Sequence, residues 1–254
     1  MKSFLLLVFA FLFSFRAIGQ ATSPQAHRQN NNALKYGFSY FGHYKLSPKW
    51  GIQTEVQSWM DENLDFPIQN VYLLGLVRFL KPNLILSAGY SQAHNHSEAF
   101  QDYFTDHRIF EQLLYINREK RHTLIHRFRL EERFVEKLKF APDSEVVTDR
   151  YLYGNRLRLF NRYMFDLTKD PEAENVFYLA TQDEVFFNIH APEINANFFD
   201  QNRFFLGVGI LKNKQTRVEI DYINFLLNPA KGKNFMIHTL GFSVIQNLDF
   251  SPKE

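Results

Sequence analysis

The chain has 254 residues and no cysteine, and its 29 basic residues nearly balance its 27 acidic residues. Hydrophobic residues make up 45% and aromatic residues 17% of the sequence, which excludes an intrinsically disordered chain because disordered chains lack the apolar side chains that drive folding. The absence of cysteine excludes a small domain held together by disulfides. No run of about 18 apolar residues follows the N-terminal region, which excludes a helical membrane protein.

The N-terminal region has the pattern of an export signal. Lys2 precedes an apolar stretch from Phe4 to Phe15, and Ala17 to Gly19 provide small residues for cleavage. This stretch is too short for a helix that spans the bilayer. The expected division of the chain has three parts: a signal peptide at 1–19, a polar N-terminal segment at 20–33 and a single β-domain at 34–254.

Removal of the signal peptide leaves 27 basic and 27 acidic residues. A nucleic-acid-binding domain needs a clustered excess of basic residues, so the sequence predicts no nucleic-acid partner.

Beyond the N-terminal region, apolar and polar residues alternate with the two-residue period of β-strands. The alternating segments lie at 34–46, 50–59, 69–80, 84–92, 109–117, 121–135, 150–165, 176–190, 200–211, 216–225 and 234–247. Tight connections are expected at 47–49, 81–83, 118–121 and 212–215, and longer polar loops at 60–68, 93–108, 136–149, 191–199 and 226–233. The connection at 168–175 is long where a short one is expected. Short turns at one end and long loops at the other predict an antiparallel up-and-down β-barrel.

The two faces of each expected strand differ in kind. In 121–135, for example, Leu124 and Phe128 share one face, and Arg127 and Arg129 share the other. The planar guanidinium group of arginine forms bidentate bonds with carboxylates and suits partly desolvated ion pairs. A ladder of arginine and acidic residues therefore indicates a narrow polar lumen, and the apolar face would contact lipid in a transmembrane barrel. The alternative is a soluble β-sandwich with a charged outer face.

The polar face of these segments predicts a lumen charge network. Its twelve members are Arg127, Arg129, Glu131, Arg133, Arg156, Arg158, Arg162, Glu184, Arg203, Arg217, Glu219 and Asp221. One interpretation is a structural filling of the barrel by ion pairs between strands. The other is a cation-lined pathway or pocket for a small anionic solute.

The number of strands follows less directly from the pattern. Eleven segments alternate, whereas bacterial single-chain barrels have an even number of strands. We expect about twelve strands, with ten as the alternative, and residues 21–33 could supply the twelfth. Trp50 and Trp59 lie at opposite ends of one segment, as residues of two aromatic girdles would, but their spacing places them on opposite faces unless a bulge intervenes.

Several short motifs, taken in order, resemble those of a known family. They are the signal peptide, Leu46-Ser47-Pro48-Lys49-Trp50, the segment from His126 to Phe134, Asn155-Arg156-Leu157-Arg158-Leu159, Asp183 to Phe186, Asp200 to Arg203, Gly207-Val208-Gly209 and His238. Together they resemble the DUF2490 family of outer-membrane β-barrel proteins of Gram-negative bacteria. The resemblance implies an outer-membrane location and no established activity. It also implies outer-membrane lipid and lipopolysaccharide as surroundings and the barrel-assembly machinery as a partner during biogenesis, and it leaves the oligomeric state open.

The sequence also contains candidate residues for two further kinds of chemistry. The expected loop at 93–108 contains His94, His96 and His107 beside several acids, a weak candidate for a metal site that lacks a known ligand spacing. We therefore assign no metal and no cofactor. The alternative function is that of a lipid-modifying enzyme, a hydrolase or an acyltransferase with its site on the barrel wall. His126 and His238 have no serine two residues away on the same face, so we assign no catalytic residue.

Overall fold

The computed structural model describes residues 34–170 and 172–252. These residues form eleven strands: β1 (Leu34–Lys45), β2 (Trp50–Met60), β3 (Pro67–Lys81), β4 (Leu84–Ser97), β5 (Asp102–Glu119), β6 (His122–Phe140), β7 (Val146–Asp166), β8 (Asn175–His190), β9 (Phe199–Lys212), β10 (Thr216–Leu227) and β11 (Phe235–Asp249). The expected signal peptide at 1–19 and the polar segment at 20–33 lie outside the described residues.

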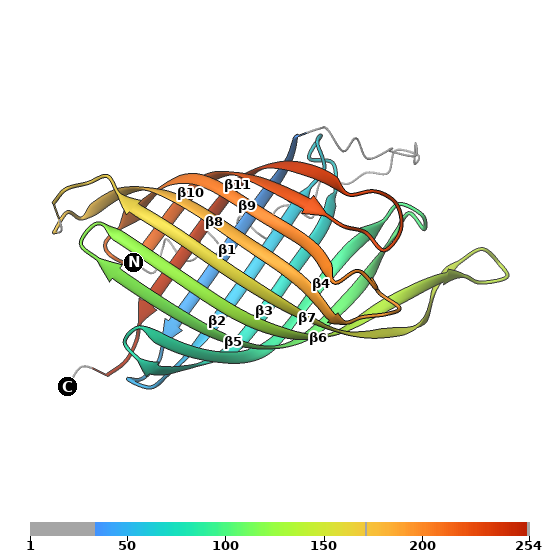
Figure 1. Cartoon of the computed structure of the whole chain (residues 1–254), viewed down its shortest axis with the longest axis horizontal. Coiled ribbons are helices and arrows are strands. Elements are labelled where there is room, and N and C mark those ends of the chain that lie inside the picture. Colours follow the sequence, from blue (N-terminus) through green and yellow to red (C-terminus); the bar gives the residue numbers. More distant parts are fainter. Residues whose placement is uncertain (1–33, 171, 253–254) are drawn as a thin grey trace. The chain divides into compact units, whose positions relative to one another are not determined.

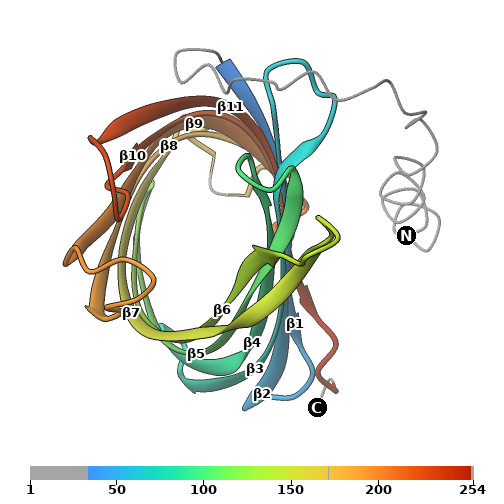
Figure 2. The same ribbon diagram turned by 90° about the vertical axis from the view of Figure 1, so that its right-hand side faces the viewer.

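The eleven strands close into one barrel in which each strand pairs with its neighbours in the chain (Figure 1). All of these neighbouring pairs are antiparallel, and the closing pair, β1 with β11, is parallel. Figure 2, turned by 90°, shows the strands as a ring. The described residues therefore contain eleven strands, which is close to the expected count of about twelve, or ten. In an up-and-down barrel with an even number of strands, the first and last strands run in opposite directions and close the ring as an antiparallel pair. Here β1 and β11 close the ring as a parallel pair, so the number of strands is odd.

Two of the expected long loops are mostly strand. The region expected as a loop at 93–108 contains the end of β4 and the start of β5, and the region at 136–149 contains the ends of β6 and β7. The hairpin of β6 and β7 turns only at 141–145 and reaches well past the neighbouring connections (Figure 1). Polar residues in these regions still alternate and pair across strands, because β-structure needs backbone pairing and not an apolar face at every level.

Trp50 and Trp59 point to opposite faces of the wall. Trp50 is exposed on the outside, with the guanidinium of Arg78 4.7 Å from its ring centre. Trp59 is buried, and its ring meets that of Phe225 edge-on at 5.2 Å. A register shift occurs between Trp59 and Met60 in the pairing of β2 with β3, after Trp59, so it does not turn the indole outward. The interpretation of Trp59 as a girdle residue is wrong.

The interior of the barrel is divided between an apolar cluster and charged side chains. The apolar cluster includes Trp59, Met164, Val176, Tyr178, Phe205, Ile223 and Phe225. Most of the charged side chains come from β5, β6, β7 and β8, which are consecutive around the ring. The outer wall carries most of the exposed large hydrophobic residues, among them Leu74, Leu206 and Ile220. The sides of the wall are thus reversed relative to a soluble protein, in which apolar residues are mostly inside.

The described part of the chain holds no helix that is long and apolar enough to cross a membrane.

Candidate functional site

The lumen is the candidate site, because the two-residue period turns the twelve charged side chains expected there toward the inside of the barrel. Nine of them are buried: Arg129, Glu131, Arg133, Arg156, Arg158, Arg162, Glu184, Glu219 and Asp221. The other three, Arg127, Arg203 and Arg217, are partly buried. Their sequence neighbours Phe128, Leu130 and Phe204 are exposed on the outer wall.

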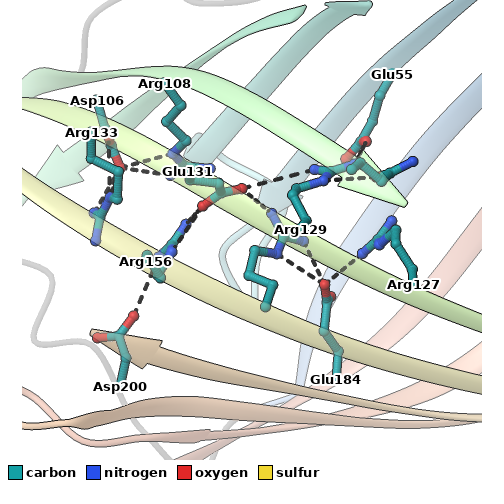
Figure 3. A network of polar contacts seen from close by, with 12 residues as sticks. Glu55, Asp106, Arg108, Arg127, Arg129, Glu131, Arg133, Arg156, Glu184 and Asp200 are labelled. Carbon is teal, nitrogen blue, oxygen red and sulfur yellow. Dashed lines mark hydrogen bonds and ion pairs between the residues drawn. The ribbon is translucent and has the colours of Figure 1, made fainter. Parts of the chain in front are cut away.

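Glu131 of β6 lies at the centre of the network (Figure 3). Arg156 donates to its Oε2 from Nε at 2.9 Å and from Nη2 at 2.7 Å, and Arg158 donates to its Oε1 from Nη1 at 2.7 Å. Both arginines project from β7, which pairs with β6. The carboxylate is 2% exposed, and burial of a charge at this depth is tolerated only when the charge is paired and hydrogen-bonded.

Arg158 extends the network to a second carboxylate, that of Glu184 on β8. It donates from Nε to Glu184 Oε1 at 2.9 Å, and Arg127 Nη2 donates to the same oxygen at 2.5 Å. Aromatic rings lie against both guanidinium groups, with Phe160 4.4 Å from Arg127 and Phe186 4.5 Å from Arg158. Because Arg158 bridges two acids on two neighbouring strands, the ion pairs form one connected array rather than isolated bridges.

Arg129 joins the array through an amide rather than a short ion pair. It donates from Nη2 and Nε to Gln112 Oε1 at 2.6 and 2.8 Å. The carboxylates of Glu55 and Glu131 lie at 4.0 and 3.9 Å from its guanidinium nitrogens. Arg129 is therefore held in place by a neutral acceptor, between two carboxylates that it approaches without close contact.

Asp106, Arg108 and Asp200 also belong to the array, and sequence reasoning did not place them there. Asp106 accepts from Arg108 Nη2 at 2.7 Å and from Arg133 Nη2 at 2.8 Å, and Asp200 accepts from Arg156 Nη1 at 3.2 Å. Asp106 was assigned to the expected loop at 93–108, whereas it lies on β5. The available signal was the alternation of Asp106, Arg108, Phe110 and Gln112, all four of which are buried.

A cavity of about 140 Å³ opens beside this outer part of the array. Its polar lining consists of Gln69, Asn95, Asp106, Arg108, Arg133, Arg156, Asp200, Gln201 and Arg203. It lies toward the end of the barrel that carries the β4–β5, β6–β7 and β8–β9 connections. Four arginines against two aspartates give this lining an excess of positive charge.

Arg203 differs from the other three arginines of the cavity. Its guanidinium lies 4.8 Å from the ring of Phe186 and 5.0 Å from that of Phe225. Its Nε is buried without a hydrogen-bond partner, and among the described residues no carboxylate oxygen lies within 4.0 Å of its nitrogens. Arg203 therefore forms no ion pair within 4.0 Å, although Glu184 lies opposite it in the pairing of β8 with β9.

The remaining predicted residues lie apart from the array. Arg162 and the hydroxyl of Tyr178 both donate to Glu219 Oε1. Asp221 packs against Gly207 and Gly241, where an added Cβ would collide with it. Within the ranges that the structure covers, neither Asp221 nor Arg217 takes part in an ion pair. The structure thus brings together eight of the twelve expected residues around the central array and its cavity, and it places four elsewhere in the lumen.

The three histidines of the metal hypothesis lie on strands, on the outer side of the wall. His94 and His96 belong to β4 and His107 to β5. Each ring contacts an aromatic neighbour, Tyr72, Tyr103 and Tyr90 respectively. In the described residues, no group of three or more histidine, cysteine, aspartate and glutamate side chains is arranged to hold a metal ion.

One element of a hydrolase site is present on the outer wall, namely a histidine with a polar partner. His126 Nδ1 lies 2.7 Å from Asn161 Oδ1 on the neighbouring strand. Within the described residues, no serine or threonine hydroxyl is hydrogen-bonded to His126. The hydroxyl of Thr105 lies 3.3 Å from His94 Nδ1, and tyrosine hydroxyls lie beside His107, His122 and His238. Asp183 and Glu184 point to opposite sides of the wall, so they do not form a pair of carboxylates.

Comparisons with known proteins concern the family and the fold. The model of the DUF2490 family, described as proteins of unknown function, matches residues 37–236. The sequence matches no curated protein. Among solved structures, the barrel is similar to the NanC porin, with 10% sequence identity and a TM-score of 0.45 over 75% of this chain and 86% of that one. The family match spans well over half of the sequence, and the chain belongs to the DUF2490 family.

Proposed function

We propose that this protein is an integral β-barrel of the bacterial outer membrane whose arginine-rich lumen binds and handles small anionic solutes. The observation that carries the proposal is the division between the two sides of the wall. Leu74, Leu206 and Ile220 on the outer side are 60%, 55% and 56% exposed, whereas the charged side chains inside are buried. A predominantly apolar exterior of this kind is favourable in hydrocarbon and unfavourable in water.

The dimensions and the closure of the barrel support insertion into a bilayer. The strands contain from 11 to 21 residues, and about 9 to 11 residues suffice for a tilted strand to cross the hydrocarbon. Closure pairs the backbone groups of all eleven strands, as the absence of water in hydrocarbon requires. The expected export signal at 1–19 agrees with this location. Outer-membrane lipid and lipopolysaccharide would then surround the wall, and the barrel-assembly machinery would insert it.

The charge distribution inside the barrel supports an anionic solute. Asp106 is shared between two arginines of the cavity and Asp200 contacts a third, whereas Arg203 has no carboxylate within 4.0 Å. A guanidinium group binds carboxylate or phosphate through two parallel hydrogen bonds. The amide groups of Gln69, Asn95 and Gln201 add neutral partners around the same cavity. We therefore place a carboxylate- or phosphate-bearing solute beside Arg203.

The apolar cluster inside the barrel limits the size of that solute. The rings of Trp59, Phe205 and Phe225 are buried and occupy space in the lumen. Side chains fill narrow barrels, and wide aqueous channels need more strands. The lumen therefore suits passage or retention of small molecules and not of oligomers.

The location is tested by fractionation of cells that express the full chain. We expect the protein in outer-membrane fractions, resistant to extraction by alkaline carbonate and released by detergent. Recovery of the folded protein from the periplasm without detergent would refute the proposal.

The solute class is tested with inorganic phosphate and acetate as probes. Titration calorimetry of the detergent-solubilised barrel should detect binding, and Arg203→Gln should weaken it at least tenfold. Arg150→Gln serves as the matched control, because Arg150 forms an exposed ion pair with Glu193 and neither residue lines the cavity. Planar bilayers should show a small, anion-selective conductance. Equal binding by both variants and the wild type, or no binding of either probe, would refute the anion site.

A further inference from the structure

The connection between β8 and β9 folds inward, against the lumen side of β7. Gly154 of β7 shares its face with the lumen residue Arg156, because side chains alternate along a strand. A Cβ added to Gly154 would lie 2.8 Å from Ala191 Cβ and 2.9 Å from Ile194 Cδ1, and Ala191 is buried. A connection that pointed away from the barrel could not reach this face. We call residues 191–197 the rim segment.

Asparagine side chains fix the rim segment to its surroundings. Asn195 is buried, and its Nδ2 donates to Asp200 Oδ1 at 3.0 Å and to the backbone carbonyl of Asn228 at 2.8 Å. Asn197 Nδ2 donates to the carbonyl of Pro229 at 2.9 Å. Asn228 and Pro229 belong to the β10–β11 connection, which lies beside the rim segment at this end of the barrel (Figure 2). Side-chain hydrogen bonds thus tie the two connections together.

The backbone of the rim segment has little freedom. Pro192 fixes one φ angle, and residues 191–197 contain no glycine, the residue that gives a connection the widest choice of conformation. The backbone N–H groups of Ile194 and Asn195 both donate to the carbonyl of Ala191, at 3.1 and 2.9 Å, which closes a compact turn. These features are those of a fixed structure rather than of a mobile lid.

An irregularity in β9 joins the rim segment to the lumen array. The register of β8 with β9 shifts between Phe186 and Phe187, which leaves Asp200 as an extra residue on β9. A bulge of this kind redirects a side chain. Asp200 Oδ1 accepts from Asn195 at 3.0 Å, and its Oδ2 accepts from Arg156 Nη1 at 3.2 Å. The carboxylate that contacts an arginine of the cavity thus also positions the rim segment.

The rim segment lies between the cavity and the mouth of the barrel. β7 runs from Val146 at this end to Asp166 at the other, and Gly154 precedes Arg156, which lines the cavity, by two residues. At about 3.3 Å per residue, the rim segment contacts β7 roughly 7 Å nearer to the mouth than Arg156. A solute that approaches the cavity from this end therefore passes the rim segment first.

We propose that the rim segment is a fixed constriction that limits the size of the anions that reach the cavity, and that Asn195 is the residue that positions it. The proposal rests on the proposed function, because it presumes that small anions enter the lumen. The one charged side chain of the rim segment, that of Glu193, is more than half exposed and pairs with Arg150. The rim segment therefore selects by size, whereas the arginines of the cavity select by charge.

Disulfide trapping tests the inward position, because the chain has no cysteine. Gly154→Cys combined with Ala191→Cys places two Cβ atoms 2.8 Å apart, and a shift of about 1 Å brings them to the roughly 3.5–4.5 Å of a disulfide. Mild oxidation of the solubilised barrel should protect both thiols from maleimide labelling. Gly154→Cys combined with Phe198→Cys is the matched control, because Phe198 lies in the same connection but is exposed. Full labelling of the 154/191 pair in a folded barrel, or equal protection of both pairs, would overturn the inward position.

The size limit is tested in planar bilayers with potassium acetate on one side and potassium gluconate, a larger carboxylate, on the other. The reversal potential gives the ratio of the two permeabilities, and the wild type should favour acetate. Asn195→Ala removes the hydrogen bonds of its side chain, so this preference should fall several-fold. Asn202→Ala should keep the wild-type ratio, because Asn202 also donates to an aspartate, Asp183 at 2.6 Å, but on the outer side of the wall. An unchanged ratio in Asn195→Ala, or the same change in both variants, would refute the constriction.

The outcomes separate this proposal from the anion site. If acetate binds with the expected dependence on Arg203 while Asn195→Ala keeps the wild-type permeability ratio, the constriction is wrong and the anion site stands. If neither the wild type nor Asn195→Ala passes acetate, the constriction is equally wrong, because it has no passage to limit. Absence of anion binding overturns both proposals.

Discussion

Substitution of Glu131 by glutamine removes the charge at the centre of the lumen array while it preserves the shape of the side chain. The wild-type carboxylate accepts three charge-assisted hydrogen bonds, two from Arg156 and one from Arg158. Glutamine retains one acceptor oxygen, and its amide group would donate toward a guanidinium. Arg156 keeps Asp200 and Arg158 keeps Glu184, so neither arginine loses every partner.

The expected cost follows from these contacts. Removal of one partner from a buried ion pair costs about 3–5 kcal/mol because the other charge is left uncompensated. Since both arginines keep a second acid, we expect a decrease of about 3 kcal/mol in the free energy of unfolding, at the lower end of that range. Glu193→Gln is the matched control: Glu193 pairs with Arg150 at 2.8 Å, but both side chains are more than half exposed, and an exposed pair contributes about 0–1 kcal/mol.

The assay is urea unfolding of the barrel in lipid vesicles or detergent, with the free energy extrapolated linearly to water. Heat-dependent mobility in gel electrophoresis establishes that each variant has formed the barrel. A loss below about 1 kcal/mol for Glu131→Gln, within the range of an exposed pair, would refute the conclusion that the array is a desolvated structural network.

Three further predictions concern other parts of the barrel. Leu206→Arg places a charge on the outer wall, so it should lower the free energy of unfolding by about 2–4 kcal/mol and reduce membrane insertion. Phe198→Arg, at an exposed position of the β8–β9 connection, should do neither. Equal insertion of both variants would contradict the assignment of the faces. Gly209→Ala should destabilise the barrel by about 1–3 kcal/mol, because an added Cβ would lie 2.5 Å from the ring of Tyr178 and 2.9 Å from Glu219. An unchanged urea midpoint would contradict this prediction, because it would show that Tyr178 moves aside without cost. Trp59→Ala removes a buried ring from the lumen and should raise single-channel conductance in planar bilayers, and an unchanged conductance would place the constriction elsewhere.

The faces of the strands were predictable because they depend on local geometry alone. Side chains alternate across a strand whatever it pairs with, so the positions of Arg129, Glu131 and Arg158 in the lumen follow from their spacing. The same rule predicted that Trp50 and Trp59 point to opposite sides. It failed for Asp106, because the polar composition of 93–108 was interpreted as a loop although the alternation continues through it.

The partners within the lumen were not predictable, because they depend on register and closure. Arg158 bridges Glu131 and Glu184 since β7 lies between β6 and β8 at one particular offset, and a shift of one residue would turn every one of these side chains to the other side. Asp200 meets Arg156 from a strand two positions away in the ring. Glu184 lies opposite Arg203 but accepts its hydrogen bonds from Arg127 and Arg158. Sequence reasoning treated all twelve charges as one equivalent ladder.

By itself, the order of residues determined the all-β class, the approximate extent of the strands and the division of the wall into apolar and charged sides, since each follows from a two-residue period along the backbone. Only the tertiary structure decided the parallel closure of β1 with β11 and the connected array around Glu131. Each of these arises from residues that are distant in sequence and adjacent only once the ring has closed at a specific register.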